Sequence, residues 1–407
     1  MTFSILTIGD EILIGKITNT NASYIAKELN ILGLTCVEQT SVGDSEKDVV
    51  DALNRLCPKS DYVIITGGLG LTDDDITKEV VSKYCGLNLR ESAAAKQRLT
   101  EYYNERKVKI DKTLLNFDLM PENCVELPNT TGVAFGFIIN RGKTKIAVFP
   151  GPPSEMRPMF RSYFLPTIKV KDDVITKYVK IFGVRELEVM QRVNSLDLDK
   201  SVLITSYCTL SEVALVLRYK SSLDAKIIDD VLVKLSKEFG KSLSTFSNME
   251  LENVVYTILQ GKNKKIAVGE SITGGKIAEK LVSVPGISAF FNEGAVCYTN
   301  ASKISRLFVL PETLGKFGAV SEQTAREMCE GLLTNPMNDI AISTTGFAGP
   351  KSKNGKEPVG KCFIGIGTKG NIKVFEHVFH GDRNTVRETC AKYALFYLIN
   401  LLKFNEL

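Results

Sequence analysis

The stretch "KKIAVGESITGGKIAEKLVSV", residues 264–284, shows the alternation on which the fold of this protein depends. Its first residues, "KKIAV", form a short apolar run that is typical of a buried strand. Its last residues carry apolar side chains at helical spacing, namely Ile277, Leu281 and Val284. The glycines between them suit a tight turn, because glycine adopts backbone conformations that other residues avoid. The stretch therefore predicts a strand, a sharp turn and a helix, which is the repeating unit of an α/β sheet.

The turn itself, "GESITGG" (Gly269–Gly275), allows two interpretations. In the first, Thr273 is the N-cap of the helix, and Gly274 and Gly275 only make the turn. In the second, backbone N–H groups at the helix N-terminus approach an anionic ligand, and Ser271 is a nucleophile. On these residues alone, capping or simple phosphate binding is favoured.

Length and composition are those of a globular protein with more than one domain. The chain has 407 residues, of which 44% are hydrophobic and 24% charged. The net charge of +4 is small and the basic residues are scattered, so there is no strong nucleic-acid signal. The first residues do not resemble a secretory signal, and the longest apolar run, "YALFYLINLL", is shorter than the ~20 residues that span a bilayer. We therefore expect a cytoplasmic protein without a membrane partner.

Cysteine and histidine usage narrows the chemistry. The nine cysteines include no CxxC pair, which favours reduced thiols over a disulfide framework or a zinc site. The two histidines, His377 and His380, lie in "NIKVFEHVFH", whose strand-like alternation points them to opposite faces. We therefore expect any hydrolytic chemistry to work without a Ser-His-Asp triad.

Strand and helix patterns divide the chain into three predicted domains, residues 1–170, 171–247 and 248–407. The first and third alternate strands with helices, whereas the second is a short run of strand, helix, strand and helix. The predicted fold class is therefore α/β, with two three-layer-type domains joined by a small α+β domain.

Polar side chains of the third domain follow its predicted strand ends. The stretch "GAVCYTNASK" places Tyr298 at the end of a strand and Lys303 just inside the next helix, and Thr345 ends another strand. Ligands of open α/β sheets bind outside the carboxyl ends of the strands, so these side chains and Ser271 could share one crevice. A lysine can act as base for a serine when burial, or a cation such as Arg383 nearby, lowers its pKa. Taken singly, Lys303 is more typical of a solvated helix residue and Tyr298 of a core residue.

Three stretches of this domain resemble the C-terminal domain of the competence/damage-inducible CinA family, which is similar to nicotinamide mononucleotide amidohydrolase. They are "GESITGGKIAEKLVSVPGISAFFNEGAVCYTNASK", "GAVSEQTAREMCEG" and "TTGFAGP…KEPVGKCFIGIG". The resemblance implies Ser271 as nucleophile, Lys303 as base and Tyr298 as the residue that shuttles or orients the proton. Ile272 stands where the family usually has a cysteine, at a position that is not the nucleophile.

The resemblance implies that this domain hydrolyses the carboxamide of nicotinamide mononucleotide, without a cofactor, to nicotinate mononucleotide and ammonia. Backbone N–H groups near the glycines of the turn or near Gly346 are expected to stabilise the oxyanion, and Arg383 to bind the substrate phosphate. The candidate substrate-binding residues of the domain are Glu270, Thr273, Gly274, Gly275, Asn300, Thr345, Gly346 and Arg383.

The first domain resembles the N-terminal half of the same family, which has a molybdopterin-binding-like fold, in "IGDEILIGKITNTNA", "GGLGLTDDDIT" and "FPGPPSEM". A glycine loop such as "GGLG" at a strand end suits a nucleotide phosphate. The carboxylates beside it either hold a divalent metal ion that polarises a pyrophosphate or only charge the next helix. The candidate metal ligands are Asp10, Asp74 and Asp75, with Glu11 and Asp73 beside them. Candidate substrate-binding residues are Asn21, Gly67, Gly68, Gly70, Ser154 and Glu155.

For this domain the resemblance implies a metal-dependent ADP-ribose pyrophosphatase, but the motif is altered. "LTD" replaces the usual proline-threonine-proline before the paired aspartates, "LLNFDLMPENCVEL" lacks the usual basic and amide residues, and Phe135 stands where proline is common. These changes surround the expected pocket. They leave open a rival hypothesis, a regulatory protein that binds nucleotides without turnover.

The second domain corresponds to the KH-like connecting domain of the family. It lacks the GxxG loop with which KH domains bind nucleic acid, so we interpret it as a spacer or dimerisation module of a homodimer. A further rival, a molybdopterin-handling protein, rests on fold analogy alone.

Overall fold

The computed structural model describes residues 1–70, 72, 74–107, 118–169, 174–350 and 357–404. They form two compact units, one of Met1–Thr176 with Lys220–Ser222 and one of Lys177–Tyr219 with Leu223–Leu407. Asp73, and the part of "LLNFDLMPENCVEL" that precedes Asp118, lie outside the described residues. The predicted α/β fold class is confirmed, whereas the division into three domains stays a prediction.

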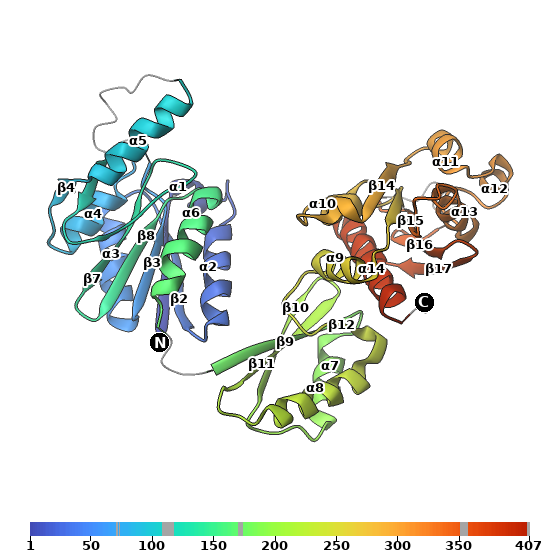
Figure 1. Ribbon diagram of the computed structural model, residues 1–407, viewed down its shortest axis with the longest axis horizontal. Helices are drawn as coiled ribbons and strands as arrows, with labels where there is room; N and C mark the ends of the chain where they lie inside the picture. The colour runs from blue at the N-terminus through green and yellow to red at the C-terminus, as the bar shows by residue number, and fades with distance from the viewer. Residues whose placement is uncertain (71, 73, 108–117, 170–173, 351–356, 405–407) are drawn as a thin grey trace. The chain divides into compact units, whose positions relative to one another are not determined.

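The first unit is built on a six-stranded sheet in the order β2-β1-β3-β8-β7-β6 (Figure 1). The neighbours from β2 to β8 are parallel, and β7 and β6 run antiparallel at one edge. The strands are β1 (Thr2–Ile8), β2 (Thr35–Val42), β3 (Tyr62–Thr66), β6 (Val125–Leu127), β7 (Gly136–Arg141) and β8 (Thr144–Phe149). A separate two-stranded ribbon pairs β4 (Leu89–Glu91) with β5 (Leu119–Pro121).

Helices cover both faces of this sheet, because its central strands are apolar on both sides. On one face α2 and α6 pack against β1 and β3, and on the other α3, α4 and α5 pack against the same strands. The helices are α1 (Asp10–Leu13), α2 (Thr20–Ile31), α3 (Glu46–Leu56), α4 (Thr77–Tyr84), α5 (Ala93–Glu105) and α6 (Pro153–Met159). The result is a three-layer α/β unit.

The second unit begins with a small α+β module. Its sheet has the order β10-β11-β9-β12, and two helices cover one side of it (Figure 1). Its elements are β9 (Val174–Phe182), α7 (Glu186–Ser195), β10 (Leu203–Thr209), β11 (Glu212–Lys220), α8 (Ala225–Phe239) and β12 (Leu243–Thr245).

The rest of the second unit is a further three-layer structure around a five-stranded sheet in the order β14-β13-β15-β16-β17. One face carries α9, α10 and α14, and the other carries α11, α12 and α13. The strands are β13 (Ile266–Glu270), β14 (Phe291–Val296), β15 (Ile340–Gly346), β16 (Lys361–Thr368) and β17 (Asn371–Val378). The helices are α9 (Leu251–Lys262), α10 (Lys276–Val282), α11 (Asn300–Leu307), α12 (Pro311–Lys316), α13 (Glu322–Leu332) and α14 (Arg383–Phe404).

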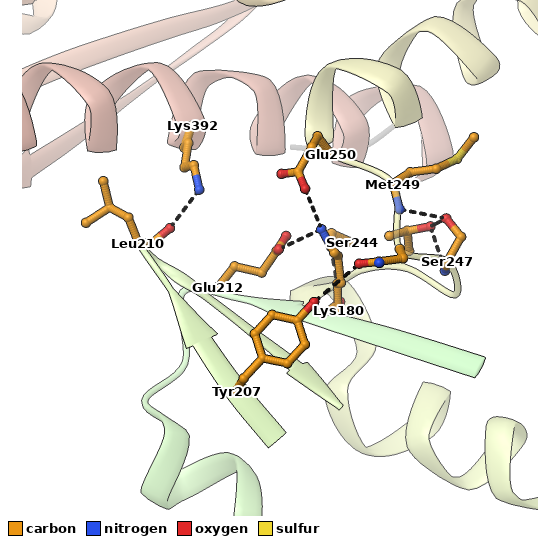
Figure 2. A network of polar contacts seen from close by, with 11 residues as sticks. Lys180, Tyr207, Leu210, Glu212, Ser244, Ser247, Met249, Glu250 and Lys392 are labelled. Carbon is orange, nitrogen blue, oxygen red and sulfur yellow. Dashed lines mark hydrogen bonds and ion pairs between the residues drawn. The ribbon is translucent and has the colours of Figure 1, made fainter. Parts of the chain in front are cut away.

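The small module and the sheet that follows it are joined by buried contacts. The ring of Phe182, at the end of β9, is 1% exposed and stacks on Phe396 of α14 with centroids 4.4 Å apart. Beside it, Lys180 Nζ lies 3.0 Å from a carboxylate oxygen of Glu212 and 3.5 Å from one of Glu250 (Figure 2). Lys180 and Glu212 both belong to the small module, so of these two ion pairs only the one with Glu250, whose side chain is 53% exposed, reaches the N-terminus of α9. The stack of Phe182 on Phe396 is the buried contact across this junction.

Among the helices that the structure describes, none combines the length and the apolar character needed to cross a membrane.

Candidate active site

Ser271 directly follows the end of β13, between β14 and β15. Both neighbours run parallel to β13 and lie on opposite sides of it, which is where α/β sheets commonly bind ligands. The Ser271 N–H donates to the carbonyl of Thr344 at 2.9 Å, and the side chain is 7% exposed. The serine is thus fixed at the carboxyl end of a central strand.

Lys303 reaches the same place from α11. Thr299 caps this helix, since its hydroxyl accepts from the N–H of Ser302 and the Ser302 hydroxyl accepts from the N–H of Thr299. The capping box fixes where the helix starts after β14, and so fixes Lys303 in its first turns. The lysine is 1% exposed, and the idea that it is a solvated helix residue is wrong.

The amine of Lys303 contacts the hydroxyl of Ser271. Its Nζ lies 2.8 Å from Ser271 Oγ and donates to the carbonyl of Cys297 at 2.8 Å. Burial lowers the pKa of Lys303 to about 8, against the opposing effect of the Cys297 thiol. The charge of Arg383 is not a cause of the lowered pKa, so that part of our expectation is wrong. With this pKa about a tenth of the Lys303 side chains are neutral at pH 7, and only the neutral amine can take the serine proton.

Tyr298, which was expected to shuttle or orient the proton between Ser271 and Lys303, has another hydrogen-bond partner. Its side chain is 61% exposed, so it is not a core residue, and its hydroxyl accepts from Arg383 Nη2 at 2.7 Å. The other terminal nitrogen of Arg383 donates to the carbonyl of Gly349. Within the described residues Tyr298 makes no hydrogen bond to Ser271 or Lys303. The structure therefore pairs Tyr298 with Arg383 beside the Ser–Lys pair.

The turn after Ser271 is held by Glu270 rather than by a threonine cap. The buried Glu270 carboxylate accepts from the N–H groups of Gly275, Ile277 and Ala278 at 2.9, 3.1 and 2.9 Å. The N-cap of α10 is Gly275, and the hydroxyl of Thr273 lies 2.7 Å from that of Thr344. The interpretation of Thr273 as N-cap is therefore wrong. The side chains of Glu270 and Thr273 therefore stabilise the turn through these hydrogen bonds.

The remaining predicted residues of this site lie at its edges. Thr345 is 1% exposed, and its hydroxyl donates to the carbonyl of Ala319 at 2.6 Å. Gly346 ends β15 opposite Cys362 of β16, and Asn300 is exposed at the start of α11. Thr345 therefore contributes packing rather than a free hydroxyl.

One residue of the site was missed. Arg387 donates from Nη2 to the carbonyl of Thr273 at 2.9 Å. It lies one helical turn after Arg383, so the i, i+4 pair in "DRNTVR" was a signal that could have pointed to it.

The first unit holds a cavity of about 540 Å³ at the carboxyl ends of β1 and β3. Its lining includes many of the predicted residues, namely Asn21, Gly67, Gly68, Gly70, Asp74, Asp75 and Glu155, together with Glu11, Asp44 and Thr66. Two positions of its glycine loop, Gly67 and Gly68, leave no space for a side chain. A Cβ on Gly67 would lie 2.0 Å from the carbonyl oxygen of Ile8, and one on Gly68 would lie 2.1 Å from Thr77 Oγ1.

The carboxylates of this cavity are partly engaged by the protein. Asp75 accepts from the N–H of Gly70 at 2.7 Å and from both the N–H and the hydroxyl of Thr72, at 2.9 and 2.6 Å. The N–H of Asp10 donates to Asp44 at 3.0 Å. Burial, and then the nearby acidic charges, raise the pKa of Asp44. The described residues include no group of three or more His, Cys, Asp or Glu side chains that could hold a metal ion, so the predicted metal ligands do not by themselves form a site.

Other polar groups of the cavity lack partners. Asn21 donates from Nδ2 to the carbonyl of Gly151 at 2.7 Å, but its buried Oδ1 accepts no hydrogen bond, and the buried Oγ1 of Thr66 has no partner. In contrast, two further predicted residues of this region have partners within the protein. The carboxylate of Glu155 accepts from the side chain of Asn129 at 2.6 Å, and the carbonyl of Ser154 accepts from the hydroxyl of Thr131 at 3.2 Å.

Comparison with known proteins covers both units. Residues 248–402 match the CinA C-terminal domain, and residues 4–170 match the probable molybdopterin binding domain. A competence-damage inducible protein of Caldicellulosiruptor saccharolyticus is 38% identical over 402 residues, which make up 97% of this chain and 98% of that protein. A CinA-like protein of Kosmotoga olearia is 34% identical over 98% of each chain. The crystal structure of a competence or damage-inducible protein from Enterobacter asburiae aligns with 38% of this chain and 97% of its own, at 30% identity and a TM-score of 0.37.

The matches to the Caldicellulosiruptor and Kosmotoga proteins extend over nearly the whole of this chain and of those relatives. The chain therefore belongs to the competence/damage-inducible CinA family.

Proposed function

We propose that the protein is a nicotinamide-nucleotide amidase, which converts nicotinamide mononucleotide to nicotinate mononucleotide and ammonia. The observation that carries the proposal is the buried contact of 2.8 Å between Lys303 Nζ and Ser271 Oγ. A serine hydroxyl is a weak nucleophile until a base removes its proton, and a neutral lysine in contact with it can serve as that base.

In the first half-reaction Ser271 Oγ attacks the carboxamide carbon while its proton passes to neutral Lys303. The carbonyl oxygen of the substrate becomes an oxyanion. When the tetrahedral intermediate collapses, the C–N bond breaks and the Lys303 ammonium gives its proton to the leaving nitrogen, which departs as ammonia. An ester between Ser271 and the nicotinoyl group remains.

In the second half-reaction water attacks the ester carbon and gives a proton to Lys303. The C–O bond to Ser271 then breaks, and the proton returns to the serine oxygen. Arg383 lies at the exposed end of the site, where its guanidinium can bind the substrate phosphate, with Tyr298 holding it in place through the contact of 2.7 Å.

The test is ammonia release from nicotinamide mononucleotide by the purified full-length protein, with nicotinamide riboside as the matched substrate that lacks the phosphate. We expect turnover of the mononucleotide and a much higher KM for the riboside. If neither substrate releases ammonia, the proposal fails.

For the first unit the cavity supports a second candidate function, binding and hydrolysis of ADP-ribose. The observation that favours a nucleotide there is the glycine loop of Gly67, Gly68 and Gly70 in the cavity lining, because a glycine loop at a strand end suits a phosphate. The described carboxylates do not form a metal site alone, so we derive no step through a metal ion. Calorimetry with ADP-ribose, followed by a hydrolysis assay with and without Mg²⁺ and with chelator, separates a hydrolase from a protein that only binds.

A further inference from the structure

The turn between Ser271 and α10 contains a row of free backbone donors. The Ser271 N–H is bonded to Thr344, and the Gly275 N–H is bonded to Glu270. In the part of the chain that the structure describes, the N–H groups of Ile272, Thr273 and Gly274 donate to no other group. Free amides just after a nucleophile are the usual components of an oxyanion hole.

Arg387 fixes one of these amides. Its Nη2 donates to the carbonyl of Thr273 at 2.9 Å, and this carbonyl belongs to the same peptide group as the Gly274 N–H. The only cis peptide bond among the described residues precedes Pro350, so the peptide between Thr273 and Gly274 is trans. In a trans peptide the C=O and N–H point in opposite directions. The Gly274 N–H therefore points away from the guanidinium.

The guanidinium also polarises this peptide. A cationic donor at the carbonyl oxygen draws electron density from the peptide nitrogen, which makes the attached N–H a stronger donor. The guanidinium lies against the turn, since a Cβ on Gly274 would be 3.1 Å from Arg387 Nη2, and Gly274 has φ of +59°. On the other side the buried Glu270 carboxylate holds the next amides. The turn is thus clamped between an anion and a cation.

We propose that the peptide between Thr273 and Gly274 supplies the oxyanion donor and that Arg387 is its positioning residue. The inference rests on the amidase function proposed above. It assigns different tasks to two arginines one turn apart on α14: Arg383 binds the substrate and Arg387 orients the transition-state donor.

The kinetic test compares Arg387→Ala, Arg387→Lys and Arg383→Ala in the full chain. A donor that acts mainly in the transition state affects kcat, so Arg387→Ala should lower kcat about 10- to 100-fold and change KM by less than about threefold. Lysine can still donate one bond to Thr273, so Arg387→Lys should recover part of the loss, as should added guanidinium in the alanine variant. Arg383→Ala should instead raise KM. The acid limb of the pH–rate profile should not move, because Lys303 is unchanged.

The control is Glu388→Gln, which removes the ion pairs of the adjacent residue with the side chains of Lys276 and Lys280 but leaves the hydrogen bond from Arg387 to Thr273 in place. Its kcat should stay within about twofold of wild type. The inference is overturned if Arg387→Ala raises KM as Arg383→Ala does, or if it leaves kcat unchanged.

A second measurement keeps this inference separate from the amidase proposal. In ligand-free full-length protein labelled with ¹⁵N-glycine, the Gly274 amide signal, assigned with Gly274→Ala, should move to lower proton frequency in Arg387→Ala. This result is expected even if no ammonia is released from the mononucleotide. An unmoved Gly274 signal would show that Arg387 does not act on this peptide.

Discussion

The two α/β sheets of this chain have the same arrangement of strands around their candidate ligand sites, but different side chains lie at those sites. In both, the first strand lies between two parallel neighbours, and a glycine-containing turn follows a strand end. At the end of β13 the two groups of the proposed catalytic pair, Ser271 and Lys303, contact each other and are buried. At the ends of β1 and β3 there is a large cavity in which Asp75 holds its own loop. Topology thus provides a location, whereas side-chain contacts decide the chemistry.

The largest expected effect tests whether only one of the two sites cleaves the mononucleotide. Ser271→Ala should lower amidase turnover by at least about 10⁴-fold, because a covalent nucleophile is lost. The fold should persist, as judged by circular dichroism and thermal unfolding. Binding of ADP-ribose to the first unit, measured by calorimetry, is the internal control and should be unaffected. A folded variant with near-normal turnover would remove Ser271 from the mechanism.

Next in size is the effect of Lys303→Arg, which keeps the charge but gives a group that stays protonated at any working pH. Turnover should fall about 10³-fold while the mononucleotide still binds, as measured by calorimetry. The arginine side chain is larger than the buried lysine that it replaces, so the variant could be misfolded. Lys303→Met, whose side chain is uncharged and close to lysine in length, therefore serves as a second variant. If either variant retains a substantial fraction of turnover, Lys303 is not the base.

A smaller effect concerns pH in the wild-type protein. Burial lowers the pKa of Lys303 to about 8, and only the neutral amine accepts the serine proton. The value of kcat/KM should therefore rise with pH through about 8, falling about tenfold per unit below it. An acid limb that is flat between pH 6 and 8 would contradict this assignment. ADP-ribose binding in the first unit should not follow this titration.

The smallest expected effect separates structural from ligand-binding carboxylates in the first unit. Asp75→Asn replaces one carboxylate oxygen by an NH2 group, so the side chain can still accept from Gly70 or from Thr72 but not from both, and the change should destabilise that unit by about 1–3 kcal/mol. The exposed Asp74 should tolerate the same change within about 0.5 kcal/mol. Urea unfolding of both variants checks the difference. Equal stabilities would mean that the Asp75 contacts do not hold the loop.

Much of the fold was predictable because burial leaves a periodic pattern. The apolar run "KKIAV" corresponds to β13, and the helical spacing after it corresponds to α10. In contrast β10 was missed, since its side chains are mostly exposed and its sequence "LITSYCT" carries no apolar stripe. The three-residue β12 is too short to show a period.

The site was predictable where spacing along the chain carries it. Ser271, Tyr298 and Lys303 could be named from one stretch, but their partners could not. Arg387 contacts Thr273 across 114 positions of sequence, and no local pattern encodes such a contact. The hydrogen bonds of Glu270 could not be predicted either, because the sequence pattern of a glutamate beside the proposed nucleophile is equally typical of a substrate ligand.

The ring of Phe182 has a consequence for any attempt to dissect this chain. The ring comes from β9, well before residue 248, yet it belongs to the apolar core that α14 completes, next to Tyr393 and Phe396. A fragment that begins at residue 248 would lack Phe182 and would expose the rings of Tyr393 and Phe396 to solvent. Exposed apolar surface of this kind promotes aggregation. A fragment that starts at Lys177 keeps Phe182 in this core. It is therefore the shorter fragment on which to test catalysis.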